Sequence, residues 1–204
     1  MSGNYQEFLN YFKGKSIAVV GSGSSVLSGE YGLEIENHDI VVRINRGYPY
    51  ERYRKYVGSR TDIWSFGMGN REDLRIKFNK MFSDRRYSMY PWFVSSWVPK
   101  YLREDPRHIT LPPGFSKAAM SKCGGTPATT GMDTIHFIVV GTECKSLSLY
   151  GLDFYKTEYW FKEEDDSIPI TYTTKEKRLA HTPKAEELFL EELIADHKKI
   201  KWIK

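Results

Sequence analysis

The sequence contains few cysteines and no long apolar run, and each scarcity excludes a class of protein. Only two cysteines occur among 204 residues, Cys123 and Cys144, and neither belongs to a CxxC pair. Neither a zinc site nor a disulfide framework is therefore indicated. The longest apolar stretches, such as Ile135–Val140, are far shorter than the ~18 residues that span a membrane. Residues 1–16 lack the pattern of a secretory signal, so we expect a cytoplasmic protein with reduced thiols, without a membrane span and at most peripheral to a membrane.

A strong excess of one charge is also lacking. The chain has 30 basic and 26 acidic residues, a net charge of +4. Nucleic-acid-binding proteins usually concentrate basic residues far more heavily. One basic aromatic segment, Tyr48–Arg60, has the composition of a base-stacking surface. We expect it instead to form a solvated connection or part of an acceptor cleft, and we expect no nucleic acid as a partner.

The residues that are abundant predict a folded α/β protein. Hydrophobic residues make up 40% of the chain, and its length fits one domain, residues 1–204. Short β-rich runs alternate with helical patterns, which favours a single-domain, Rossmann-like parallel sheet flanked by helices. The expected strands are 16–20, 39–44, 61–66, 90–95 and 146–150, with a short strand at the C-terminus. The expected helices are 71–82, one beginning near 130, and 182–197 with Leu188, Leu190, Leu193 and Ile194 facing inward.

Two loops have the composition of anion-binding sites. Gly21–Ser25 follows the first strand, and its backbone N–H groups can converge on a phosphate. Val26 stands where the dinucleotide fingerprint has its third glycine, and no acidic residue is clearly placed after the second strand. A nicotinamide-dependent oxidoreductase is therefore weakly supported, and a tight turn without ligand is an alternative. The loop 124–131 begins a helix, where its hydroxyl groups fit either anion binding or capping by Thr129 or Thr130.

His181 is the histidine best suited to catalysis. It lies just before the C-terminal helix, with Glu186 following after four intervening residues. A histidine in a polar pocket is the usual general base, although a surface or capping role fits the same position. His136 falls on an apolar helix face, and we expect it to be a core residue.

Three ordered segments together resemble the sialyltransferases, glycosyltransferase family 29. Ile17–Asn45 is similar to the large sialyl motif, with Tyr31-Gly32, His38-Asp39 and Arg43 before Asn45, and the motif ends at Asp62. Residues 126–151 are similar to the small motif, and residues 181–186 match the very small motif. The resemblance covers nearly all of the chain and implies a GT-A-like variant of the nucleotide-binding fold.

The resemblance also implies an activity and the residues that perform it. The family transfers sialic acid from CMP-sialic acid to a glycan hydroxyl, with inversion and without a metal, so no cofactor is expected. His181 would be the general base, with Glu186, Arg43 and Tyr159 in supporting roles. The donor would be held by the two loops and by the ends of two strands, at Gly21, Ser22, Gly23, Ser24, Asn45, Thr129, Thr130, Gly131 and Gly151.

The chain departs from the family pattern at three positions. Ile17 replaces a motif cysteine whose partner corresponds to Cys144, so the family disulfide cannot form, which agrees with a short bacterial or virus-encoded enzyme. Ser22 replaces an asparagine, and no histidine precedes Tyr159, so Tyr159, Tyr172 or Arg178 would stabilise the phosphate instead. Asp165-Asp166 resembles a solvated acidic loop more than a metal motif.

Two alternative functions remain open at this stage. CMP-Kdo is a rival donor because it is also a CMP-activated 2-keto acid. A non-catalytic nucleotide- or glycan-binding module of the same fold is the other alternative. Acceptor specificity is expected to lie on loops, here the ranges 67–71, 112–123 and 155–174.

Overall fold

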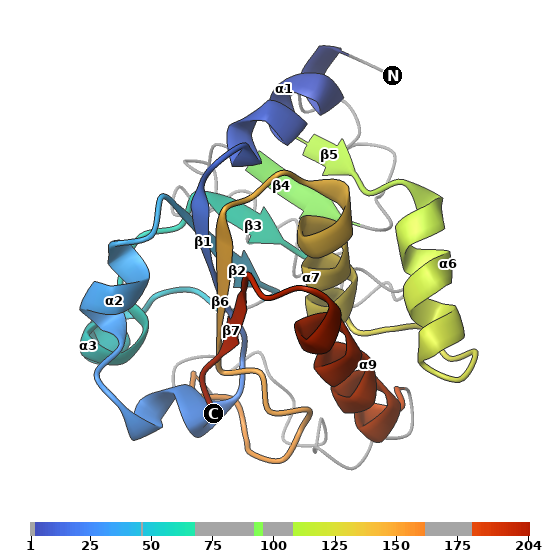
Figure 1. The fold of residues 1–204 in the computed structure, drawn as a ribbon. Helices are drawn as coiled ribbons and strands as arrows, with labels where there is room; N and C mark the ends of the chain where they lie inside the picture. The colour runs from blue at the N-terminus through green and yellow to red at the C-terminus, as the bar shows by residue number, and fades with distance from the viewer. Residues whose placement is uncertain (1–2, 46, 68–91, 96–107, 162–180) are drawn as a thin grey trace, which may run out of the picture.

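The computed structural model describes residues 3–45, 47–67, 92–95, 108–161 and 181–204. Seven β-strands and several helices alternate along these residues (Figure 1). The strands are β1 (Ser16–Val20), β2 (Ile40–Ile44), β3 (Ile63–Ser65), β4 (Trp92–Ser95), β5 (His108–Thr110), β6 (Ser146–Tyr150) and β7 (Ile200–Trp202). The α-helices are α1 (Gly3–Phe12), α2 (Gly32–Glu36), α3 (Arg54–Val57), α6 (Pro113–Lys122), α7 (Thr130–Gly141) and α9 (Pro183–Asp196), and the 3-10 helices are η1 (Ser24–Ser28) and η2 (Glu51–Tyr53).

All strands pair in parallel in one sheet with the order β5-β4-β3-β2-β1-β6-β7. The central strand β1 therefore has β2 on one side and β6 on the other, with Val20 opposite Arg43 and Tyr150. Because the chain moves outward from β1 in one direction and later returns to its other side, the order reverses beside β1. In open α/β sheets ligands bind at such a point, outside the carboxyl ends of the strands.

Helices cover both faces of the sheet and bury its apolar side chains. One face carries α1, α6, α7 and α9, and the other carries η1, α2 and α3 (Figure 1). Successive side chains of a strand point to opposite faces. Ile17 and Val19 of β1 accordingly pack with Phe8 and Phe137, whereas Ala18 and Val20 belong to a second apolar cluster. Burial on both faces explains why these strands appear in the sequence as continuous apolar runs.

The predicted parallel α/β architecture is confirmed. The predicted strands 16–20 and 146–150 have the observed bounds of β1 and β6, and the other three predicted ranges begin one to two residues early. The C-terminal helix exists, but Leu188 is 53% exposed and Phe189, at 5% exposure, packs in its place. His136 is a core residue as predicted, with Nδ1 bonded to the carbonyl oxygen of Phe115 at 3.2 Å.

The segment 112–123 was predicted to be a loop, and this prediction is wrong because most of it forms α6. Pro113 occupies the first turn of that helix, where proline is tolerated because the missing N–H would have no helical partner. The predicted helix 71–82 lies outside the described residues. Among the helices that the structure describes, none is both long and apolar enough to cross a membrane.

Candidate active site

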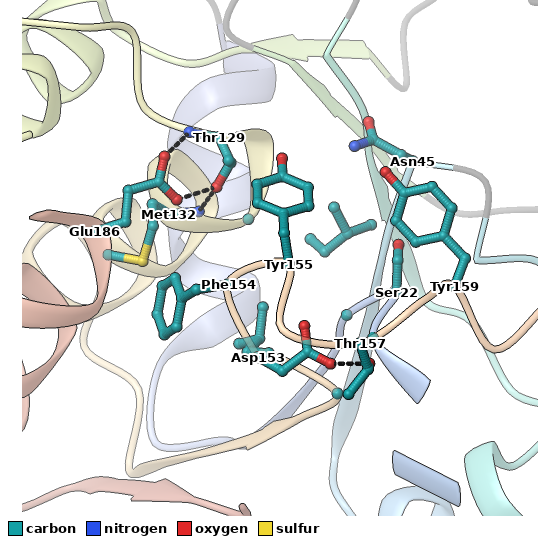
Figure 2. A pocket seen from close by; sticks show the side chains of 16 residues that line it. Ser22, Asn45, Thr129, Met132, Asp153, Phe154, Tyr155, Thr157, Tyr159 and Glu186 are labelled. Atoms are coloured by element: carbon teal, nitrogen blue, oxygen red, sulfur yellow. Dashed lines mark hydrogen bonds between the residues drawn. The ribbon is translucent and has the colours of Figure 1, made fainter. Parts of the chain in front are cut away.

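A pocket lies at the carboxyl edge of the sheet, where β1, β2 and β6 end (Figure 2). The starts of α7 and α9 complete its wall, so segments far apart in the sequence meet there. The lining residues are Gly21, Ser22, Gly23, Ile44, Asn45, Thr129, Gly131, Met132, Gly151, Leu152, Asp153, Phe154, Tyr155, Thr157, Tyr159 and Glu186. Nine of the thirteen residues predicted for the site are in this set, and Ser24, Arg43, Thr130 and His181 are not.

The glycine loop forms the floor of the pocket rather than a ring of free donors. Gly21 N–H donates to Tyr150 O at 2.8 Å, and Gly23 N–H donates to Gly151 O at 2.9 Å. Ser24 N–H donates a hydrogen bond to Thr157 Oγ1 at 2.8 Å. These three N–H groups are therefore used within the protein and are not available to a phosphate. The physical reason is that the chain leaving β6 runs along the loop and takes up its donors.

Glycine at position 21 is required by this close approach. A Cβ there would lie 2.5 Å from Gly151 O and 2.9 Å from Leu152 Cδ2. We expect Gly21→Ala to lower the free energy of unfolding by about 1 to 3 kcal/mol, because β1 and β6 must separate. Gly114→Ala is the control, since its Cβ would meet no atom within 4 Å, and alanine favours the helix by up to about 1 kcal/mol. Urea unfolding measures both variants, and equal midpoints would contradict the contact.

Asn45 presents a hydrogen-bond donor to the pocket from the end of β2. Its φ is +51°, a left-handed conformation that asparagine tolerates better than most residues. Its N–H donates to Ser65 O at 2.8 Å, and its Oδ1 accepts from Gly67 N–H at 3.0 Å. With Oδ1 occupied, the amide nitrogen Nδ2 is the group left to contact a ligand. Figure 2 shows this amide directed toward the pocket.

Arg43 holds the neighbouring loop in place and does not line the pocket. Its side chain is 1% exposed. Nε donates to Arg60 O at 3.1 Å and to Thr61 Oγ1 at 2.9 Å, and one terminal nitrogen donates to Val57 O at 2.8 Å. The supporting role predicted for Arg43 is therefore structural, because it fixes the segment between α3 and β3.

The residues around the start of α9 are hydrogen-bonded to the loop that begins α7. Thr126 and Thr182 join their hydroxyl groups at 2.6 Å. Glu186 Oε1 accepts from Thr129 N–H at 2.8 Å, and Oε2 accepts from the Thr129 hydroxyl at 2.7 Å. His181 Nδ1 bonds to Pro127 O at 3.0 Å. Four residues separate His181 from Glu186, and both side chains hydrogen-bond to the short loop before α7, at Pro127 and Thr129.

The bond to Pro127 O decides which nitrogen of His181 can act as a base. A carbonyl oxygen only accepts, so Nδ1 must carry the hydrogen, and Nε2 keeps the lone pair in the neutral ring. Tyr155, which does line the pocket, lies nearly parallel to the His181 ring, with centroids 6.2 Å apart and an interplanar angle of 12°. His181 therefore lies beside a residue that lines the pocket.

Burial controls the charge state of two groups in this wall. Glu186 is 1% exposed, and burial, aided by nearby Asp133, raises its pKa above the usual value. The two bonds from Thr129 and the charge of His181 oppose this effect. Burial also raises the pKa of the Tyr155 hydroxyl, so this group is a neutral donor at physiological pH.

Sequence reasoning missed the segment Asp153–Thr157 as part of this pocket. It had assigned residues from 155 onward to an acceptor loop. Phe154 and Tyr155 both have left-handed backbones, with φ of +54° and +62°, a conformation that costs about 1 to 3 kcal/mol per residue. The signal that could have found them is their place directly after a buried strand, because the carboxyl ends of parallel strands form the ligand edge.

A parallel sheet with a glycine loop after its first strand and a helix start facing the same edge is the arrangement of doubly wound α/β folds, whose ligands bind at this edge. Among the described residues, no group of three histidine, cysteine, aspartate or glutamate side chains is placed to hold a metal ion. Cys123 and Cys144 are buried free thiols. Asp165-Asp166 lies outside the described residues.

Comparison with known proteins shows similarity to one family. The family model "Glycosyltransferase family 29 (sialyltransferase)" matches residues 13–89. Sialyltransferase-like protein 2 of Arabidopsis thaliana is 25% identical over 170 residues, which cover 81% of this chain and 34% of that protein. Beta-1,6-galactosyltransferase GALT29A of Arabidopsis thaliana is 46% identical over 48 residues, 24% of this chain and 12% of that protein. Residues 13–89 are therefore similar to glycosyltransferase family 29, and the chain spans about a third or less of the length of these relatives.

Solved structures are similar to this chain at the level of the fold. A mammalian sialyltransferase in complex with Gal-beta-1-3GalNAc-ortho-nitrophenol superposes with a TM-score of 0.57 and 16% sequence identity. The match covers 94% of this chain and 70% of that chain. A second mammalian sialyltransferase structure gives a TM-score of 0.54 at 18% identity. The GT-A-like variant of the parallel α/β fold is therefore confirmed.

Proposed function

We propose that this chain is a glycosyltransferase that moves sialic acid from CMP-sialic acid to a glycan hydroxyl, with inversion and without a metal ion. The observation that carries the proposal is the hydrogen bond between His181 Nδ1 and Pro127 O. It leaves Nε2 as the basic nitrogen, and the loop that accepts the bond also forms a wall of the candidate donor pocket. The proposed base and the proposed donor pocket are thus both built on the loop before α7.

The donor would be held by neutral hydrogen-bond donors. Asn45 offers its Nδ2, Ser22 and Tyr159 offer hydroxyl groups, and Thr130 and Gly131 belong to the first turn of α7, where N–H groups favour an anion. Such groups can stabilise the charge that develops on a single phosphate as it leaves. Tyr159 is our candidate for the role of the missing family histidine, and Tyr155, with its neutral hydroxyl, would assist it.

The proposed reaction is one displacement. Nε2 of His181 takes the proton of the acceptor hydroxyl while that oxygen forms a bond to the anomeric carbon. The bond from this carbon to the phosphate oxygen breaks, and CMP leaves with the electron pair. Attack on the side opposite the leaving group inverts the anomeric centre. Positioned proton transfer of this kind contributes about 100- to 10,000-fold to a rate.

A different donor sugar is the second candidate function. One relative is named as a galactosyltransferase rather than a sialyltransferase, so donors carrying UMP or UDP belong in the test. CMP-Kdo also remains a candidate because it shares the CMP and 2-keto acid groups. A non-catalytic binding module would bind a nucleotide without consuming any of these donors. For the acceptor we begin with Gal-beta-1-3GalNAc-ortho-nitrophenol, which is bound in the mammalian structure.

The first test is thermal unfolding with CMP, UMP, CDP, NAD or no ligand. We expect CMP to raise the melting temperature most, because a ligand at about 100 times its dissociation constant stabilises by about 2.7 kcal/mol. Release of CMP from CMP-sialic acid and from CMP-Kdo, with the galactoside acceptor present, then measures transfer. Stabilisation by UMP alone would favour the galactosyl alternative. Stabilisation by NAD alone would contradict the proposal.

A further inference from the structure

One side chain that lines the pocket, Asp153, is a carboxylate and would repel an anionic ligand. Asp153 lies three residues after the end of β6, and one of its oxygens points into the pocket in Figure 2. Its other oxygen, Oδ2, accepts a hydrogen bond from the Thr157 hydroxyl. Among the described residues, Oδ1 has no hydrogen-bond partner. Glu186 also lines the pocket, but Thr129 occupies both of its oxygens.

The surrounding residues hold this carboxylate against the glycine loop. A Cβ at position 23 would lie 2.1 Å from Asp153 Oδ2 and 2.7 Å from Oδ1, so only glycine leaves room for the carboxylate. The Thr157 hydroxyl that donates to Asp153 also accepts from Ser24 N–H at 2.8 Å. Ser24 N–H therefore fixes the Thr157 hydroxyl, and the close approach to Gly23 limits where the Asp153 carboxylate lies.

The chemistry of the carboxylate limits what it can bind. A phosphate or a sugar carboxylate would be repelled, whereas a neutral hydroxyl group can donate to Oδ1. Folds of this class place an acidic residue after the second strand, where it accepts from the ribose hydroxyls. Here the residue after β2 is Asn45, which is not acidic. Asp153 follows β6, the neighbour of β1 on the opposite side.

We propose that Asp153 accepts hydrogen bonds from the vicinal hydroxyls of the donor's ribose and so determines which way the nucleotide lies. The ribose then lies at the Gly23 end of the pocket, and repulsion from Asp153 directs the phosphate toward Asn45 and Tyr159. In Figure 2 these two side chains lie on the opposite side of the pocket from Asp153. This inference rests on the proposed function, because it assumes that the ligand is a ribonucleotide.

The experiment compares ribose and base recognition in wild-type protein and in variants. Dissociation constants for CMP, 2′,3′-dideoxy-CMP and UMP are measured by calorimetry. A hydrogen bond to a charged group predicts that wild type binds CMP about 10- to 100-fold more tightly than the dideoxy form. Asp153→Asn keeps an oxygen for Thr157 and is expected to reduce this ratio to about 5-fold or less. Asp153→Ala is expected to reduce it further, with folding checked by thermal unfolding.

The controls separate the inference from the proposed function. Asp196→Asn removes one negative charge at the exposed end of α9 and should leave the ratio unchanged. An equal ratio in wild type and both Asp153 variants would overturn the inference alone. A variant that instead loses the preference for CMP over UMP would also overturn it, because the carboxylate would then contact the base. Failure of wild-type protein to bind CMP would overturn the proposed function as well.

Discussion

Replacing His181 with alanine is expected to lower the rate of sugar transfer by about 100- to 10,000-fold and to leave the affinity for CMP nearly unchanged. The rate falls because alanine has no group that takes the proton of the acceptor hydroxyl as its bond to the sugar forms. Affinity is retained because His181 does not line the pocket and lies beside Tyr155. Release of CMP from CMP-sialic acid measures the rate, and calorimetry measures the affinity.

His197→Ala is the matched control for this experiment. His197 ends the helix that follows His181, and its backbone N–H caps Leu193, a bond that alanine retains. A rate close to wild type in His181→Ala would remove this residue as the base. Loss of CMP binding in parallel with the rate would instead assign His181 a structural role, through its bond to Pro127.

The parallel sheet could be predicted because its signal is local. Strands buried on both faces appear as short apolar runs, and β1 and β6 were found with their observed bounds. Helix α6 was missed because its sequence, PGFSKAAMSK, carries no clear apolar stripe and buries only Ala119 fully. Leu188 was predicted to face inward, but Phe189 does so instead. The apolar periodicity of a charged helix does not fix its rotation to within one residue.

The site could be predicted only where a motif names the residue. Asn45, Thr129 and Glu186 were found in this way, and they meet in one pocket. The sequence could not predict that the chain after β6 accepts hydrogen bonds from N–H groups of the glycine loop. Contacts such as Gly23 with Gly151 join segments about 130 residues apart. The motif gives Arg43 a supporting role, but its bonds to Val57, Arg60 and Thr61 could not be read from the sequence because a motif does not say which contacts a supporting side chain makes.

Removing the Glu186 carboxylate is expected to have the largest effect on stability. Glu186→Ala leaves the N–H and hydroxyl groups of Thr129 without their acceptor in a partly buried place. Each unsatisfied buried group costs about 1 to 3 kcal/mol, so we expect a loss of at least about 2 kcal/mol in the free energy of unfolding. Glu191→Ala, at an exposed position of the same helix, should change stability by less than about 0.5 kcal/mol. Urea unfolding at neutral pH measures both variants.

The pH dependence of this effect follows from the direction of the pKa shift. Burial raises the pKa of Glu186 above its ordinary value of 4.5, so the folded chain holds this proton more tightly than the unfolded chain. The stability that the group contributes is therefore greatest below that value and falls as the pH rises through the folded pKa. Glu186→Gln cannot titrate at this position and lacks this dependence.

Unfolding wild type and Glu186→Gln at about pH 5 and about pH 7.5 tests the sign. The stability advantage of wild type should be larger at the lower pH, because there its carboxyl group retains more of its proton. An advantage that grows as the pH rises would mean that the bonds from Thr129 and the start of α7 outweigh burial. In that case the charged carboxylate would be the form that stabilises the loop beside the base, and Glu186 would have a lowered pKa.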